Sequence, residues 1–327
     1  MPETMKQLQI RAPGEAVWQD APVPEPGPGE VLVKVALVNT CPHWDLHLMA
    51  GVPMFAGGTL AYPYTAGQPG HEAAGEVVAL GAGVTDLRPG ARVACWRDAG
   101  HHRAGCYAQY VAMACEHVLE LPDHVSWEQA ASLELAMCVQ VSVEQLQRNR
   151  FLAGKRLAVG GLGPAGLVAL QLLRAHGAAW VVGVDPLPAR RDLARALGAD
   201  AAVSPDAAAW SQATGGQVDA AIDCTGLKVS IEFLLERVAR AVCVFGVLRE
   251  TVEYRAAWWG GRSLFGYEPH NAEAARQALG LIAAGQLDLT RLISARLPFT
   301  RYAEGIDRLR RQEALKIGFL PWGESGA

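Results

Sequence analysis

The stretch Arg156-Leu-Ala-Val-Gly-Gly-Leu-Gly-Pro-Ala-Gly166 joins a short apolar segment to a glycine pattern of the form GxGxxG. Residues 156–160 have the composition of a buried strand, and residues 164–176 have the periodicity of a helix. In such a turn the first glycine permits a tight bend, the second lets the backbone approach a pyrophosphate, and the third lets helix and strand pack closely. The helix N-terminus also offers free N–H groups to phosphates. The stretch therefore predicts a Rossmann unit that binds a dinucleotide.

The next predicted strand, residues 180–185, ends in an acidic side chain, Asp185. A carboxylate there can accept the ribose hydroxyls of NAD, and it would repel the 2′-phosphate of NADP. Arg190 and Arg191 follow, and an arginine nearby can instead bind a phosphate. We expect NAD as the cofactor. The predicted cofactor-binding residues are Gly161, Leu162, Gly163, Pro164, Gly166, Asp185, Arg190, Thr225 and Gly246.

Strands and helices alternate around this unit, whereas the first 120 residues are rich in predicted strands. The early strands are expected at residues 31–38, 75–80 and 91–95. A helix should start after Ser126, because Gln129 can complete a capping box. Further strands are expected at 220–223 and 241–245, and helices at 187–197, 228–240 and 272–284. This order predicts an α/β fold with a parallel sheet covered by helices.

Composition limits the possible partners and location. The 327 residues suit two domains of about 150 residues each, and the net charge of −4 argues against general affinity for nucleic acid or anionic membranes. Neither a signal peptide nor a membrane span of about 20 apolar residues is visible. The seven scattered cysteines suit a reduced, cytoplasmic protein. A small-molecule substrate is the expected partner.

Three separate segments carry side chains that bind metals. Cys41 follows the strand at 31–38, His71 and Glu72 stand in a Gly-His-Glu segment, and Glu134 lies after the predicted capping box. A thiolate, an imidazole and a carboxylate that converge on one point can form a tetrahedral zinc site with an open position. These residues are the candidate metal ligands.

The chain resembles the medium-chain dehydrogenase/reductase superfamily, and within it the zinc-type alcohol dehydrogenase branch. The resemblance rests on motifs along nearly the whole chain: VLVKV, GHEAAGEVVALGAGV, RPGARV, GCYAQYV, GLGPAG, IDCTG and KIGFLPWG. It implies a β-rich GroES-like catalytic domain at residues 1–122 and 269–327. It also implies a Rossmann NAD-binding domain at residues 123–268, with a doubly wound parallel sheet.

The same resemblance implies catalytic roles. Cys41, His71 and Glu134 correspond to ligands of a catalytic zinc ion, and Glu72 can itself ligate. His47 corresponds to the histidine that passes the alcohol proton to solvent. The implied reaction transfers a hydride between an alcohol or polyol, or the corresponding aldehyde or ketone, and NAD(H).

The cysteine-rich lobe that binds a structural zinc ion in many relatives is missing, so one catalytic ion and no structural ion are expected. Residues 94–104 stand in its place. The neighbouring Cys95, His101, His102 and Cys106 match no standard zinc spacing, and a loop beside the substrate is expected instead.

The motif around Cys41 departs from the family pattern. Asp45 stands four residues after Cys41, whereas the pattern has three. A one-residue insertion after Cys41 would keep the thiolate and place His43 or Trp44 where the family has a proton-relaying Ser or Thr. Alternatively, His43 replaces Cys41 as a ligand.

Two other functions remain open. One is a zinc-independent reductase of the same superfamily that acts on quinones or activated double bonds with NAD(P)H. The other is a catalytically silent NAD(H)-binding sensor or scaffold. Residues 262–267 resemble the edge strand that pairs across a two-fold axis in the family, so a homodimer or homotetramer is expected.

Overall fold

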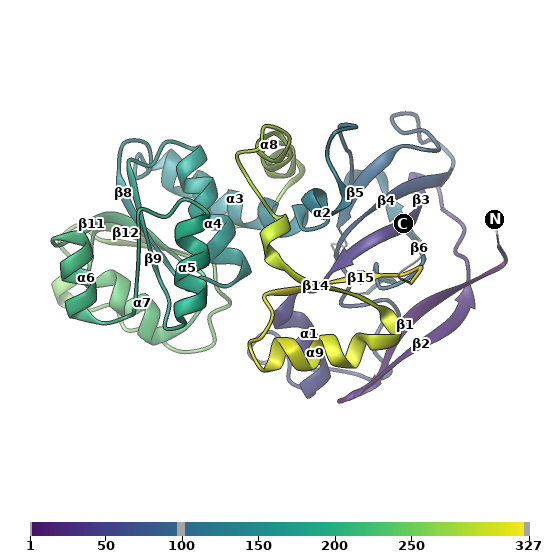
Figure 1. The fold of residues 1–327 in the computed structure, drawn as a ribbon, viewed down its shortest axis with the longest axis horizontal. Helices are drawn as coiled ribbons and strands as arrows, with labels where there is room; N and C mark the ends of the chain where they lie inside the picture. Colours follow the sequence, from purple (N-terminus) through teal and green to yellow (C-terminus); the bar gives the residue numbers. More distant parts are fainter. Residues whose placement is uncertain (1, 97–101, 324–327) are drawn as a thin grey trace. The chain divides into compact units, whose positions relative to one another are not determined.

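The computed structural model describes residues 2–96 and 102–323 (Figure 1). The chain divides into two compact units. The first comprises Met1–Glu134 and Leu289–Ala327, and the second comprises Leu135–Asp288. These units divide the chain at other positions than the expected domain boundaries after residues 122 and 268, which stay a prediction. Helix α2 (Trp127–Ala130) packs on the sheet of the first unit, and α8 (Ala272–Ala283) falls in the second.

The first unit is built on an extended sheet whose strand order is β14-β15-β3-β4-β5-β7, with β6 also paired to β3. Its strands are β3 (Glu30–Asn39), β4 (Glu72–Leu80), β5 (Arg92–Trp96), β6 (Tyr110–Ala114), β7 (Val118–Glu120), β14 (Ile293–Pro298) and β15 (Lys316–Leu320). A separate hairpin contains β1 (Thr4–Ala12) and β2 (Glu15–Pro22). The helical elements are α1 (Pro42–Ala50), α2, α9 (Tyr302–Arg310), η1 (Cys115–His117), η3 (Thr290–Leu292) and η4 (Phe299–Arg301).

Strand β3 forms the centre of this unit because its side chains are apolar on both faces. Leu32 packs with Met5 and Tyr110 in one cluster, while Val31, Val33 and Val35 belong to a larger core. Four aromatic rings extend that core toward the C-terminal segment. They are Tyr107, Phe299, Tyr302 and Phe319.

The second unit contains a parallel sheet with strand order β10-β9-β8-β11-β12-β13. Its strands are β8 (Arg156–Gly160), β9 (Trp180–Val184), β10 (Ala201–Val203), β11 (Val218–Asp223), β12 (Val238–Val244) and β13 (Ser263–Phe265). The helical elements are α4 (Pro164–Ala175), α5 (Pro188–Ala196), α6 (Ala207–Thr214), α7 (Lys228–Leu235), α8 and η2 (Ala256–Trp258). Helix α3 (Leu133–Arg148) begins at the end of the first unit and continues into the second.

The predicted α/β fold with a doubly wound parallel sheet is confirmed. The strand order reverses between β8 and β11, and ligands of such sheets bind at the carboxyl ends of the strands at this point. One predicted helix, at 228–240, is too long. Helix α7 ends at Leu235, and Val238 already pairs with Val218 as the start of β12. Within the described residues, no helix is long and apolar enough to cross a membrane.

Candidate active site

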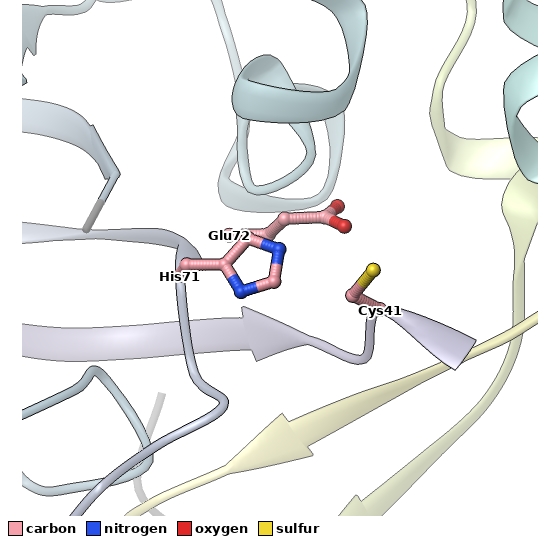
Figure 2. Close-up of side chains that lie close together, drawn as sticks. All are labelled: Cys41, His71 and Glu72. Atoms are coloured by element: carbon pink, nitrogen blue, oxygen red, sulfur yellow. The ribbon is translucent and has the colours of Figure 1, made fainter. Parts of the chain in front are cut away.

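Strand pairing brings the predicted metal ligands of the first unit together. Strands β3 and β4 are antiparallel, with Asn39 opposite Glu72. Cys41 lies just beyond β3 as the N-cap of α1, while His71 immediately precedes β4. One potential ligand atom from each of Cys41, His71 and Glu72 lies within 4.8 Å of the others (Figure 2). The register of two adjacent strands therefore creates a thiol, imidazole and carboxylate cluster.

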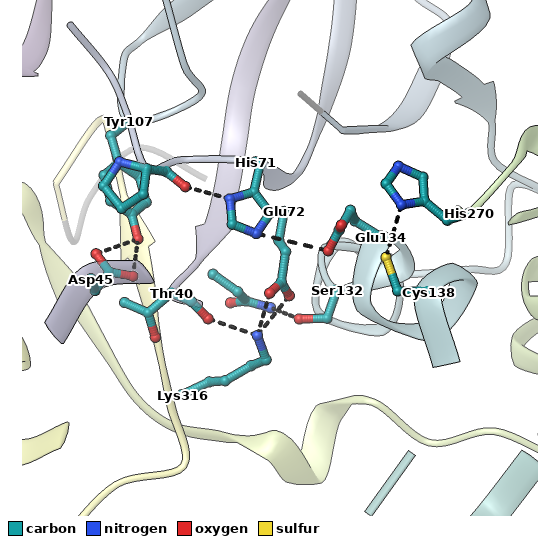
Figure 3. A network of polar contacts seen from close by, with 12 residues as sticks. Thr40, Asp45, His71, Glu72, Tyr107, Ser132, Glu134, Cys138, His270 and Lys316 are labelled. Atoms are coloured by element: carbon teal, nitrogen blue, oxygen red, sulfur yellow. Dashed lines mark hydrogen bonds and ion pairs between the residues drawn. The ribbon is translucent and has the colours of Figure 1, made fainter. Parts of the chain in front are cut away.

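His71 is oriented by the backbone beside it. Its Nδ1 lies 2.6 Å from the carbonyl oxygen of Pro69, so Nε2 is the nitrogen that faces the cluster. Oε2 of Glu134 lies 3.8 Å from Nε2 (Figure 3). Two ligands of one tetrahedral zinc ion are separated by about 3.4 Å, given metal–ligand bonds of about 2.1 Å. Glu134 is thus close enough to share an ion with His71.

The charges around His71 are those of a cation site. Burial alone lowers the pKa of His71, but the Cys41 hydrogen bond and the carboxylates of Glu134 and Glu72 outweigh it and raise the pKa to about 10. The surroundings therefore favour a positive charge at the position of His71. A zinc ion would supply that charge, and the donor set of thiolate, imidazole and carboxylate suits zinc.

Glu72 has a partner that the sequence did not reveal. The Nζ of Lys316 donates to Oε1 and Oε2 of Glu72 at 2.5 and 2.7 Å, and to the carbonyl oxygen of Thr40 at 2.7 Å. Lys316 and Glu72 are each 1% exposed. Lys316 opens the KIGFLPWG motif, which supported the family resemblance but provided no predicted site residue.

The Asp45 carboxyl, which made the Cys41 motif irregular, is completely buried. It accepts hydrogen bonds from the hydroxyls of Tyr107, at 2.8 Å, and Tyr302, at 2.7 Å. Desolvation raises its pKa to about 6, although both tyrosine hydrogen bonds lower it. The backbone N–H of Asp45 also donates to the carbonyl of Cys41, so this contact fixes the first turn of α1 beside the thiol.

Other residues of α1 occupy distinct places. His43 is exposed, and its ring meets His47 edge-on at 6.1 Å. Trp44 packs edge-on against Phe55 at 5.7 Å. Nδ1 of His47 lies 3.3 Å from the carbonyl oxygen of Val52. Among the described residues, the potential metal cluster around His71 contains Cys41 and Glu72 and does not contain His43 or Glu134.

The second unit carries the predicted cofactor turn. Gly161 has a φ of +80°, which favours glycine, and a Cβ on Gly166 would overlap the carbonyl oxygen of Gly161. Pro164 begins α4 directly after Gly163. These features match the roles that the glycine pattern predicts for the turn, namely a tight bend and close helix–strand packing.

Asp185 lies beside this turn and is 2% exposed. Oδ2 accepts a hydrogen bond from the N–H of Leu162, and Oδ1 accepts one from the N–H of Leu187, both at 2.8 Å. Nη1 of Arg190 lies 3.6 Å from the same carboxylate. The acidic side chain thus joins the glycine turn to the end of β9 and the start of α5.

Thr225 and Gly246 follow two neighbouring strands, and Asp223 organises both of them. The Asp223 side chain accepts hydrogen bonds from Thr225, Gly226 and Ser230, and its carbonyl accepts from the N–H of Gly246. Asp223 was not among the residues predicted from the sequence. Its position at the end of β11, before Cys-Thr-Gly, was the available signal.

The region expected to replace the structural-zinc lobe is described in part. Cys95 lies in β5, and Cys106 is buried in the core of the first unit. His101 lies outside the described residues, so the expected absence of a structural zinc ion stays a prediction. None of the seven cysteines forms a disulfide bond within the described residues.

Two family descriptions match the chain. Residues 27–123 match an alcohol dehydrogenase GroES-like domain, and residues 164–260 match a zinc-binding dehydrogenase domain. The chain is 33% identical to (R,R)-butanediol dehydrogenase of Bacillus subtilis over 63% of this chain and 66% of that enzyme. It is 30% identical to sorbitol dehydrogenase of Ovis aries over 69% of this chain and 70% of that enzyme.

Solved structures extend the likeness to nearly the whole chain. The 2R,3R-butanediol dehydrogenase of Bacillus subtilis superposes with a TM-score of 0.83 at 25% identity, covering 97% of this chain and 99% of that one. A zinc-binding dehydrogenase of Sinorhizobium meliloti bound to NADP gives a TM-score of 0.84 at 27% identity, with coverage of 98% and 100%. The chain belongs to the zinc-type alcohol dehydrogenase branch of the medium-chain dehydrogenase/reductase superfamily.

Proposed function

We propose that this protein is an NAD-dependent alcohol or polyol dehydrogenase with one catalytic zinc ion. The observation that carries the proposal is the convergence of Cys41, His71 and Glu72 within 4.8 Å, with Glu134 beside His71. Cys41, His71 and Glu134 are the residues that would hold the metal. Relatives named butanediol and sorbitol dehydrogenases support an alcohol or polyol substrate.

The chemistry divides between the bound groups and the protein. Bound zinc would acidify the substrate hydroxyl, and bound NAD would accept the hydride. The thiolate of Cys41 and the carboxylate of Glu134 would offset the charge of the ion, while the Pro69 carbonyl keeps the His71 ring in place. His47 would take the substrate proton toward solvent.

The cofactor preference rests on Asp185. Its carboxylate is held by Leu162 and Leu187 at the glycine turn, where the adenosine ribose of a dinucleotide binds. Its negative charge favours ribose hydroxyls over a 2′-phosphate. Arg190 lies near enough to Asp185 to offset part of that charge. The protein should therefore prefer NAD while still accepting NADP less efficiently.

For the assembly we propose a homodimer, or a tetramer of dimers, that pairs through β13. This strand bonds to β12, and no described strand borders its other edge, where Leu264 is 38% exposed. An open strand edge is a template for pairing with a second copy. Sedimentation should give at least a dimer mass, and Leu264→Asp should lower it. A monomeric wild-type protein would contradict the assembly.

The function is tested by turnover. Purified protein should oxidise members of a panel of alcohols and polyols with NAD, lose this activity on chelation and regain it with added zinc. Metal-independent reduction of enones with NADPH would instead identify the zinc-independent reductase. NADH binding without turnover of any alcohol or carbonyl would identify the silent binding protein.

A further inference from the structure

Lys316 reaches the candidate zinc site from the far end of the chain. Its ammonium group and the Glu72 carboxylate are separated by 244 residues in sequence. The backbone fixes Lys316 in place. The N–H of Ile317 donates to Oγ1 of Thr40, and the N–H of Thr40 donates to the carbonyl of Ile317, both at 2.9 Å. Strand β15 is therefore attached to the residue next to Cys41.

Each N–H of the Lys316 ammonium group has a hydrogen-bond acceptor nearby. The group has three N–H donors, and three acceptor atoms lie within 2.7 Å: both carboxylate oxygens of Glu72 and the carbonyl oxygen of Thr40. Figure 3 shows the Glu72 carboxylate directed at Lys316, while Glu134 faces His71. Glu72 is near enough to the cluster to bind its metal, yet both of its oxygens bond to the lysine.

The charges divide into two balanced sets. In the proposed site, Cys41 and Glu134 would balance the two charges of zinc, and Lys316 balances Glu72. If Glu72 also ligated the ion, the zinc would carry three anionic ligands and Lys316 would lose a buried partner. An unpaired buried charge is strongly unfavourable. The stable arrangement is therefore the one in which Glu72 pairs with Lys316 and the ion pairs with Cys41 and Glu134.

We propose that Lys316 is a positioning residue that withholds Glu72 from the metal and keeps the fourth zinc position open for substrate. This inference rests on the proposed zinc site. It assigns Glu72 to a supporting role and leaves Cys41, His71 and Glu134 as the protein ligands. Without the lysine charge, a metal bound to Cys41, His71 and Glu134 would be the cation left to pair with the buried Glu72 carboxylate, and Glu72 would close the site.

The test uses full-length protein loaded with zinc or cobalt(II). Lys316→Met removes the charge but keeps a long side chain. The double variant Glu72→Gln/Lys316→Met replaces the buried pair with neutral groups, a change that folds usually tolerate. Chelator competition measures zinc affinity. Imidazole, a neutral ligand, is titrated against the cobalt spectrum to report the open position.

Lys316→Met should bind zinc at least about tenfold more tightly, a typical scale for groups around a metal site. It should also bind imidazole at least about tenfold more weakly, because Glu72 fills the open position. The double variant should match wild type within roughly threefold in both measurements, since it lacks the competing carboxylate.

Three results would overturn the inference. Lys316→Met could match wild type in both titrations. The double variant could lose zinc affinity by about tenfold or more, which would show that Glu72 is a ligand in the wild-type protein. If Lys316→Met does not fold, the zinc affinity of the double variant becomes the test. An affinity within roughly threefold of wild type supports the inference, and a loss of about tenfold or more overturns it. Wild-type protein that shows no thiolate–cobalt charge-transfer band would contradict the proposed zinc site itself, and the inference with it.

Discussion

At the scale of single residues, Asp45 shows how the fold uses a carboxyl that it does not expose to water. Tyr107 and Tyr302 donate to it from two other segments, and burial raises the pKa of both phenols, so they remain protonated donors. These two hydrogen bonds join α1, which begins beside Cys41, to the core of the first unit. Asp45 thus supports the site without touching it.

The raised pKa of Asp45 predicts a pH-dependent stability. Desolvation raises the value from 3.8 to about 6, so the folded protein holds this proton more tightly than the unfolded chain. The resulting stabilisation is complete below about pH 4 and is lost as the pH rises through 6. Relative to Asp45→Asn, which lacks this proton, the wild-type free energy of unfolding should fall by about 2–3 kcal/mol between pH 4 and pH 7. Denaturant unfolding measures this difference, and a constant difference over that range would contradict the account.

Asp185 predicts the cofactor preference. Asp185→Asn removes the negative charge beside the ribose site, so the ratio of kcat/KM for NAD to that for NADP should fall by about 10- to 100-fold. Asp192→Asn, which changes an exposed acidic residue of the following helix α5, should leave the ratio unchanged. Initial rates with both cofactors provide the measurement. An unchanged ratio in Asp185→Asn would show that another group sets the preference.

Short motifs revealed part of the site. Cys41, His71 and Glu72 stand at predicted strand ends, so their meeting follows from strand pairing. Lys316 gave no such signal, because its role depends on a contact between segments 244 residues apart. The partners of Asp45 were hidden for the same reason, since Tyr302 is 257 residues away.

At the scale of elements, the glycine turn depends on the close packing of β8 and α4. A Cβ at Gly166 would overlap the Gly161 carbonyl, so Gly166→Ala should move the start of α4 away from the turn. Overpacking of this kind costs about 1–3 kcal/mol. NADH should bind at least about tenfold more weakly, as measured by fluorescence titration.

Gly280→Ala is the matched control for that change. Gly280 lies in α8, and a Cβ added there would meet no neighbouring side chain or strand within 4 Å. Because alanine favours a helix over glycine, this variant should gain about 0.5–1 kcal/mol of stability and bind NADH normally. Normal NADH binding by Gly166→Ala would contradict the packing argument.

The elements themselves were predicted unevenly. The periodicity of the sequence predicted the bounds of β3, β8, β9 and α4 closely. The predicted capping box at Ser126 is also present. The end of α7 was misplaced, because the helical periodicity of the sequence continues to residue 240, whereas Val238 pairs with Val218 of β11 and begins β12. Helix α3 joins the two units, so composition alone gave no boundary within it.

At the scale of the whole molecule, the two proposed sites belong to different units. Cys41, His71 and Glu134 lie in the first unit, while the glycine turn and Asp185 lie in the second. Each site is therefore formed by the local structure of its own unit. Loss of a metal ligand should abolish turnover while leaving the cofactor turn intact.

The zinc content of purified wild-type protein and of His71→Asn, measured by mass spectrometry of the metal, tests the central claim most directly. We predict about one zinc ion per chain in wild type and almost none in His71→Asn, because three protein ligands hold a catalytic zinc. NADH binding should be retained in both proteins. An active wild-type protein without zinc, or a His71→Asn protein that keeps its full zinc content, would contradict the account.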